Sequence, residues 1–197
     1  MMTARPLTAL LPLALLSACV APVGPVEVTR FHLPDTSMLG RGAVTVVPGA
    51  GMDAQSLEYR TYASAVARQL VLLGYAEQVA GSAPQRAEVR LRREIWREGA
   101  GRSPVSVGVG GSTGSYGSGI GVGIGLNLSG PPPEQVTTEL SVTIREAASE
   151  RALWEGRASF TVKASSPMAQ TQLGAAKLAE ALFKDFPGRS GETVLVK

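Results

Sequence analysis

The strongest constraint on the fold is a period-two alternation of apolar and polar residues in the second half of the chain. Residues 136–144 carry an apolar residue or threonine at every second position, and residues 154–162 repeat this alternation with two aromatic residues. Successive side chains of a β-strand point to opposite faces of a sheet, so this spacing predicts two strands that each bury one face. The polar stretch 146–151 predicts a turn, and the pair is expected to form an antiparallel hairpin.

A glycine-rich segment, residues 104–130, shows the same alternation. Valine alternates with serine or glycine over 105–109, and aliphatic residues alternate with glycine from residue 119 onward. This pattern predicts a second hairpin, with its turn near residues 111–119, rather than a flexible linker. An exposed edge hairpin without a binding role is the simpler interpretation. The sharper hypothesis makes the aliphatic residues of the second arm an interaction surface: Ile120, Val122, Ile124 and Leu126.

Two other segments have helical spacing. Apolar residues at intervals of four and three predict a helix between Asp53, a suitable N-cap, and Gly74, a C-terminal stop. Ser166 followed by Pro167 predicts the start of a second helix, which ends before Pro187. Shorter alternating patterns predict further strands, the first and last of them at sheet edges: 26–31, 42–47, 75–79, 87–95 and 194–196.

These elements predict an α+β domain in which two helices pack on one face of a mostly antiparallel sheet, with the Gly-rich β-hairpin added to it. Residues 36–197 are assigned to this domain, because the length suffices for one core and not for two full domains. In segment 87–95 arginine and glutamate alternate with the apolar positions. Interleaved charges of both signs are typical of a solvated strand face, so we expect no nucleic-acid partner.

The N-terminal residues have the pattern of a bacterial lipoprotein signal. Arg5 precedes an apolar run, 7–16, and small residues lead from that run to Cys19, the only cysteine of the chain. This predicts a signal peptide over residues 1–18, cleavage between Ala18 and Cys19, and lipidation of Cys19. Acylation of the Cys19 sulfur and of its new amino group would provide several acyl chains, more than the two signals that stable anchoring requires.

Residues 19–35 contain three prolines and few strong helix formers, which predicts an extended, lipidated tether. Val20 follows the cysteine where an aspartate would stand in lipoproteins kept at the inner membrane. By resemblance to that sorting rule, we expect delivery to the outer membrane, with the domain lipid-anchored and facing the periplasm. After Cys19 the sequence has no apolar run long enough for a transmembrane helix.

No set of residues matches a complete catalytic or metal-binding pattern. Residues 110–114 have the spacing of a nucleophile elbow, but that pattern needs a following helix and a downstream histidine. The only histidine is His32, upstream of it and without the companion ligands that a transition metal needs. Trp96 and Trp154 lie at strand ends, where packing is expected rather than ligand stacking. We therefore expect no enzyme activity, no cofactor and no metal site.

Several short motifs together are similar to those of a known group of proteins. Besides the lipoprotein signal and the Gly-rich segment, the motifs are Ser56-Leu57-Glu58-Tyr59, Gly74-Tyr75, the strand 88–96, Trp154-Glu155-Gly156-Arg157-Ala158 and Phe186-Pro187. The chain in this respect resembles the bacterial lipoproteins of the domain-of-unknown-function family 4136 (DUF4136), over about residues 31–187. That family often has an aromatic-rich first strand ending in tryptophan, where this chain has residues 42–48, which leaves the register of the first strand open. The family has no assigned activity, so the resemblance implies fold and location and no catalytic residue.

The leading hypothesis is a non-enzymatic outer-membrane lipoprotein, a periplasm-facing binding or accessory module in envelope assembly or maintenance. Its expected partners are the membrane, through the lipid anchor, and an envelope protein or polymer. The alternative is an oligomeric pore or secretion component that uses the Gly-rich hairpin, since a transmembrane β-strand needs about 9–11 alternating residues. A hydrolase is a third hypothesis, which activity of the purified domain on ester or glycan substrates would support.

Overall fold

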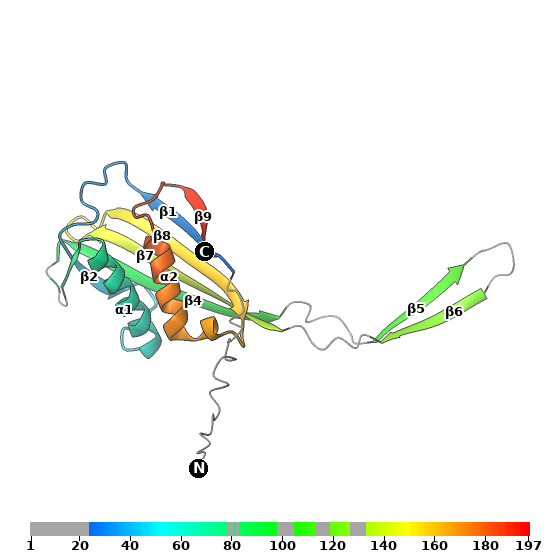
Figure 1. The fold of residues 1–197 in the computed structure, drawn as a ribbon. Helices are drawn as coiled ribbons and strands as arrows, with labels where there is room; N and C mark the ends of the chain where they lie inside the picture. Colours follow the sequence, from blue (N-terminus) through cyan, green and yellow to red (C-terminus); the bar gives the residue numbers. More distant parts are fainter. Residues whose placement is uncertain (1–23, 79–80, 82, 98–104, 113–118, 127–132) are drawn as a thin grey trace, which may run out of the picture.

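The computed structural model describes residues 24–78, 81, 83–97, 105–112, 119–126 and 133–197. In chain order its elements are β1 (Val26–His32), β2 (Ala43–Pro48), α1 (Leu57–Leu72), β3 (Ala76–Glu77), β4 (Gln85–Arg97), β5 (Val105–Ser112), β6 (Gly119–Leu126), β7 (Glu134–Glu146), β8 (Ala152–Lys163), the 3-10 helix η1 (Pro167–Ala169), α2 (Thr171–Phe183) and β9 (Glu192–Val196). Seven strands form one sheet in the order β3-β2-β4-β7-β8-β1-β9, and β5 and β6 form a separate two-stranded sheet (Figure 1).

Long antiparallel pairings occupy the centre of the large sheet. β7 pairs with β8 from Gln135 opposite Lys163 to Arg145 opposite Ala152, with one register shift beside the turn. β4 pairs with β7 in the same sense along its whole length. The hairpin that the alternation of residues 136–162 predicts is therefore confirmed.

The sheet is mixed, so the predicted architecture of two helices on a mostly antiparallel sheet is wrong, although the broader α+β class is compatible with the structure. β2 pairs in parallel with both β3 and β4. Parallel neighbours need a crossover connection instead of a tight turn, and α1 provides it between β2 and the next strands. Alternation along a segment predicts that a strand exists, but not its direction, which here depends on the path of this helix.

The two ends of the described chain meet at one side of the sheet. β1 lies between β8 and β9, so the edge position expected for residues 26–31 is wrong, and part of the segment 19–35 is an inner strand. β9 is the edge strand, as expected for residues 194–196. The predicted signal peptide, the cleavage position at Ala18 and the lipidation site at Cys19 lie outside the described residues.

Serine caps the start of α1 and the start of η1, the turn before α2, whereas the N-cap of α2 itself, Gln170, makes no side-chain cap hydrogen bond. Ser56 is the N-cap of α1, and its Oγ accepts a hydrogen bond from the backbone N–H of Tyr59 at 3.4 Å. The predicted cap, Asp53, instead accepts from the N–H of Gln55 in the preceding turn. Gly74 follows the end of α1 with a φ of 101°, which confirms it as the stop. Ser166 caps η1, the short turn that leads into α2.

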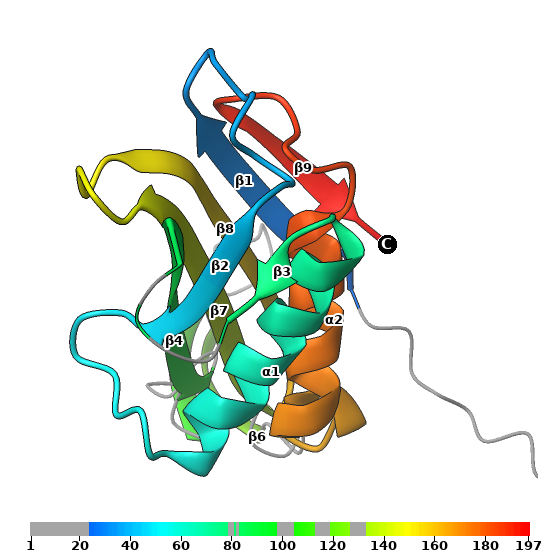
Figure 2. The same ribbon diagram turned by 90° about the vertical axis from the view of Figure 1, so that its left-hand side faces the viewer.

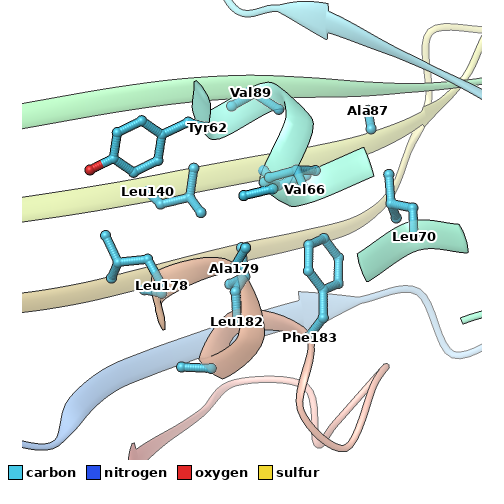
Figure 3. Packing of buried hydrophobic residues seen from close by; sticks show 14 of the residues in the cluster. Tyr62, Val66, Leu70, Ala87, Val89, Leu140, Leu178, Ala179, Leu182 and Phe183 are labelled. Atoms are coloured by element: carbon cyan, nitrogen blue, oxygen red, sulfur yellow. The ribbon is translucent and has the colours of Figure 1, made fainter. Parts of the chain in front are cut away.

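The hydrophobic core lies between the sheet and the two helices, which run side by side over one face of it (Figure 2). Each helix contributes one apolar stripe, and the facing strands contribute every second residue. Burial at this interface raises the pKa of Tyr62 to about 12. Figure 3 shows the central members: Tyr62, Val66, Leu70, Ala87, Val89, Leu140, Leu178, Ala179, Leu182 and Phe183.

Trp154 fixes the end of α2 against β8. Its fully buried ring stacks on Phe183 with centroids 5.4 Å apart, and its centroid lies 5.2 Å from that of Phe186. The indole Nε1 donates a hydrogen bond to the carbonyl oxygen of Pro187 at 3.0 Å. Trp154 is therefore a packing residue, as expected. The ring lies across Gly156, where an added Cβ would come within 2.2 Å of it.

We expect Gly156→Ala to lower the free energy of unfolding by about 1–3 kcal/mol, because the new methyl group would displace the Trp154 ring. Urea unfolding of the purified protein, followed by tryptophan fluorescence, measures this change. Gly24→Ala is the matched control, because an added Cβ there meets no atom within 4 Å. Equal unfolding midpoints for the two variants would contradict the packing described here.

Candidate functional site

The face of the sheet opposite the helices carries a groove of about 540 Å³. The groove crosses β4, β7, β8 and β1, and the loop between β2 and α1 lines it with residues 50–52. We call it the open-face groove and define it by its charged residues, its hydroxyl residues and one aromatic ring: Arg90, Arg92, Arg145, Arg157, Glu139, Glu155, Thr29, Ser141, Thr143 and Phe31.

The strand alternation that builds the core also places the groove residues. On β7 the buried positions run from Val136 to Ile144 in steps of two. The intervening residues Glu139, Ser141 and Thr143 therefore lie on the opposite face. The same parity holds on the other groove strands, so polar side chains from four strands meet on one surface.

Basic residues outnumber acidic residues in the groove lining, which contains four arginines and two glutamates. Arg157 Nε lies 3.4 Å from Glu139 Oε1, and Arg92 pairs with Glu94 at 2.6 Å. These ion pairs are solvent-exposed, and such pairs contribute about 0–1 kcal/mol to stability. They hold the arginines loosely, and a ligand carboxylate can compete for the guanidinium groups.

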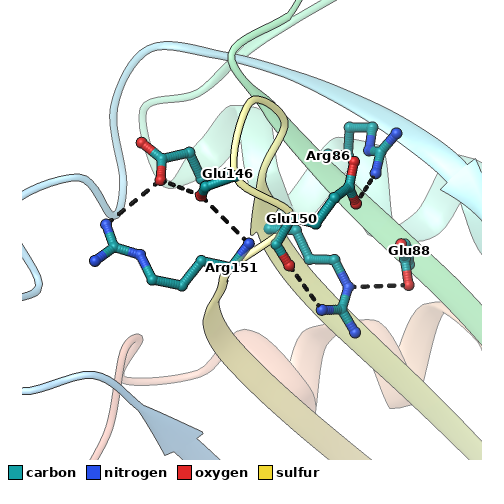
Figure 4. Close-up of polar contacts among 7 residues, drawn as sticks. Arg86, Glu88, Glu146, Glu150 and Arg151 are labelled. Carbon is teal, nitrogen blue, oxygen red and sulfur yellow. Dashed lines mark hydrogen bonds and ion pairs between the residues drawn. The ribbon is translucent and has the colours of Figure 1, made fainter.

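A polar network surrounds the β7–β8 turn (Figure 4). Arg145, which lines the groove, belongs to this network. Arg145 Nε lies 3.3 Å from Glu88 Oε2, and its Nη1 donates to the carbonyl oxygen of Glu150 at 3.0 Å. Glu150 also pairs with Arg86, and Arg151 pairs with Glu146. Arg145 is thus already engaged in the fold, which makes it less available to a ligand than Arg90.

Arg90 lies over a glycine at the end of β2. An added Cβ at Gly49 would come within 2.3 Å of the Arg90 side chain, so the absence of a side chain there makes room for it. Gly49 is held against β4 by a hydrogen bond from its N–H to the carbonyl oxygen of Val89 at 2.9 Å. Among the residues that the structure describes, Arg90 forms no ion pair.

Two partly exposed aromatic rings lie on this face. Phe31, at the side of the groove on β1, is 53% exposed. Trp96 lies further along β4, outside the groove lining, and is 44% exposed. Its Nε1 donates to Thr137 Oγ1 at 3.1 Å, and that hydroxyl lies 2.8 Å from Thr161 Oγ1. Trp96 therefore packs across the polar side of the strands and not into the core.

A second cavity, of about 460 Å³, lies near the C-terminal end of α2 and includes Arg30. This buried guanidinium donates to the carbonyl oxygens of Leu182 at 2.9 Å and Ala181 at 3.0 Å. Burial lowers the pKa of Arg30, and the nearby carboxylates of Asp185 and Glu192 act in the opposite direction. Because the side chain satisfies the last carbonyls of the helix, its role is structural.

His32 belongs to this structural region and not to the groove. Its Nδ1 lies 2.7 Å from the carbonyl oxygen of Leu33, and its Nε2 lies 3.2 Å from that of Gly188. Within the described ranges there is no group of three or more metal-ligating side chains. Neither helix in that part of the chain is both long and apolar enough to cross a membrane.

β5 and β6 pair as an antiparallel hairpin, as the alternation predicts, and residues 113–118 between them lie outside the described residues. Ile120 stands opposite Gly111, and the other three candidate residues stand opposite valines: Val122 opposite Val109, Ile124 opposite Val107 and Leu126 opposite Val105. At the intervening positions glycine stands opposite glycine twice and opposite serine twice. Their interaction role stays a prediction.

Sequence reasoning did not predict the open-face groove. The alternation of residues 87–95 predicted that arginine and glutamate share one face of the strand, and that face was interpreted as solvated. The signal that could have found the groove lies between the apolar positions of the strands 136–144 and 154–162, where charged and hydroxyl residues recur. Only the strand order shows that these positions form one continuous surface.

No family model matches the chain. An uncharacterised protein of Zymomonas mobilis, ZMO1243, is 30% identical to it over 218 residues, which cover 88% of this chain and 80% of that protein. The chain belongs to the family of this uncharacterised bacterial protein. No activity is attached to the name of this relative, so the family membership alone assigns none.

Two solved structures are distantly similar to this chain. A PDZ domain protein from Parabacteroides distasonis has a TM-score of 0.47 and 9% identity over 88% of this chain, which spans 39% of that protein. The PelC dodecamer from Paraburkholderia phytofirmans has a TM-score of 0.42 and 12% identity, covering 84% of this chain and 99% of PelC.

Proposed function

We propose that this chain is a lipid-anchored outer-membrane protein that faces the periplasm and binds an envelope partner through the open-face groove. The observation that carries the proposal is the one-sided covering of the sheet, which leaves a polar groove on the face without helices. A concave surface on which a few polar groups converge is the usual form of a binding site. The lipoprotein signal ending at Cys19 supports the location.

We propose a binding or accessory role in envelope assembly or maintenance, and not catalysis. The chemistry of the groove supports this choice. Ser141 Oγ lies 3.4 Å from Glu139, whose carboxylate is also engaged by Arg157. His32 is not part of the groove lining, and its ring nitrogens lie beside the carbonyl oxygens of Leu33 and Gly188, so it is no base for that hydroxyl.

We also propose that the family shared with the Zymomonas protein is DUF4136. The motifs that resemble this family have clear structural roles, which supports the assignment. Ser56 caps α1, and Gly74 ends it. Trp154 and Phe186 form part of the aromatic cluster at the end of α2.

The lipid anchor is tested by Cys19→Ala in cells. We expect the uncleaved precursor to accumulate and the protein to leave the outer-membrane fraction, because the acylated sulfur is lost. Globomycin, which blocks the lipoprotein signal peptidase, should cause the same accumulation with the wild-type chain. Ser17→Ala is the matched control, because it keeps a small residue in the signal. A mature, membrane-bound Cys19→Ala protein would contradict the anchor.

An oligomeric pore or secretion component is the second candidate function, and the register of β5 and β6 is the observation that favours it. Aliphatic residues stand mainly opposite one another, and at the alternate positions glycine stands opposite glycine or serine. One face of the ribbon is thus made of aliphatic positions and the other of glycine and serine positions. A ribbon of this kind suits close contact with a second apolar surface.

Deletion of residues 108–128 separates the two candidate functions. We expect the remaining domain to keep the unfolding midpoint of the wild-type protein, because β5 and β6 pair only with each other among the described strands. Its mass in solution should be that of the wild-type protein minus the deleted residues. Sedimentation of the detergent-solubilised proteins measures the mass. A wild-type oligomer that becomes monomeric on deletion would favour the pore component instead.

A further inference from the structure

We propose that the open-face groove binds an acidic glycan, an extended chain of sugars that carries carboxylate groups. This inference rests on the proposed function as a binding module and names the ligand class of its groove. It follows from the charge of the lining, from its hydroxyl groups and from the position of the groove on the face of the sheet.

The first argument is charge complementarity. Four arginines line the groove, and three of them already pair with a glutamate: Arg157 with Glu139, Arg92 with Glu94 and Arg145 with Glu88. Arg90 has no ion-pair partner among the described residues. A guanidinium group presents parallel N–H donors that match a carboxylate. Arg90 thus offers a guanidinium to a ligand carboxylate, and the exposed pairs of Arg92 and Arg157 can open to a competing carboxylate.

The second argument is the arrangement of donors and acceptors across the strands. Arg90 on β4 stands opposite Ser141 on β7, which stands opposite Arg157 on β8, which stands opposite Thr29 on β1. Neighbouring strands lie about 4.8 Å apart. A chain lying across the strands therefore meets guanidinium and hydroxyl groups in alternation. Hydroxyls both donate and accept, as sugar hydroxyls need.

A second row lies beside the first and adds an apolar contact. Thr143 on β7 stands opposite Glu155 on β8, and Glu155 stands opposite Phe31 on β1. The Phe31 ring is 53% exposed, and its face offers an apolar surface to the C–H side of a sugar ring. Glu155 adds an acceptor for sugar hydroxyls beside it.

The position of the groove disfavours an acidic peptide. An extended peptide binds a sheet best at an edge strand, which offers free backbone donors and acceptors. The groove lies instead over β7 and β8, whose backbones are paired on both sides. A glycan has no peptide groups to satisfy, so side chains on the face of the sheet are sufficient for it.

Calorimetric titration of the full-length protein in detergent tests the ligand class. The probes are polygalacturonate, neutral dextran and poly-L-glutamate, which has carboxylates but no sugar hydroxyls. We expect polygalacturonate to bind at least about tenfold more tightly than dextran, because hydrogen bonds to charged groups contribute about 1.5–3 kcal/mol. This binding should weaken in 0.5 M NaCl, since the groove is solvent-exposed.

Arg90→Gln tests the site. We expect it to weaken polygalacturonate binding about tenfold by removing a charge-assisted hydrogen bond. Arg97→Gln is the matched control, because Arg97 lies on the same strand, is exposed and is not part of the groove lining. Phe31→Ala should weaken binding to polygalacturonate and leave the unfolding midpoint near that of the wild type, as its ring is half exposed.

Two results would overturn the inference: equal affinity for polygalacturonate and dextran, or equal affinity of the Arg90→Gln and Arg97→Gln variants. Binding of poly-L-glutamate as tight as that of polygalacturonate, with no effect of Phe31→Ala, would replace the glycan with an acidic peptide. These outcomes are independent of the fractionation of Cys19→Ala. If polygalacturonate does not bind but Cys19→Ala leaves the outer-membrane fraction, the proposed ligand class is rejected. The proposal of a lipid-anchored binding module then still stands.

Discussion

A wide sheet with helices on one face only is the constraint on which the rest of the structure depends. α1 and α2 cover one side of the seven strands, and the apolar half of each alternating strand faces them. Because side chains alternate along a strand, a slip of one residue would exchange the two faces. The buried Trp154 and the Arg30 cap hold α2 in place over the centre of the sheet.

The same constraint produces the candidate site. The positions left over from the core face water, and on four neighbouring strands they are arginine, serine, arginine and threonine in one row. The site is therefore a property of the sheet and not of a loop. Its side chains make few contacts with the core, and exposed substitutions of this kind change stability little. Binding and folding can consequently be tested with separate variants.

The sequence was sufficient for the elements whose pattern is local. The β7–β8 hairpin, the β5–β6 pairing, the stop of α1 at Gly74 and the edge strand β9 follow from alternation and from cap residues. The parallel pairing of β2 and the inner position of β1 do not, because they depend on which strands meet in space. The groove was missed for the same reason, since Thr29, Arg90 and Arg157 are far apart in the chain.

The central claim is that the polar face of this sheet is the binding surface. Chemical-shift mapping by NMR of the isotope-labelled full-length protein, titrated with polygalacturonate, tests it most directly. The account predicts shift changes confined to the groove residues of β1, β4, β7 and β8, with α1 and α2 unaffected. Changes centred on the outer surfaces of the helices, or on β5 and β6, would contradict it.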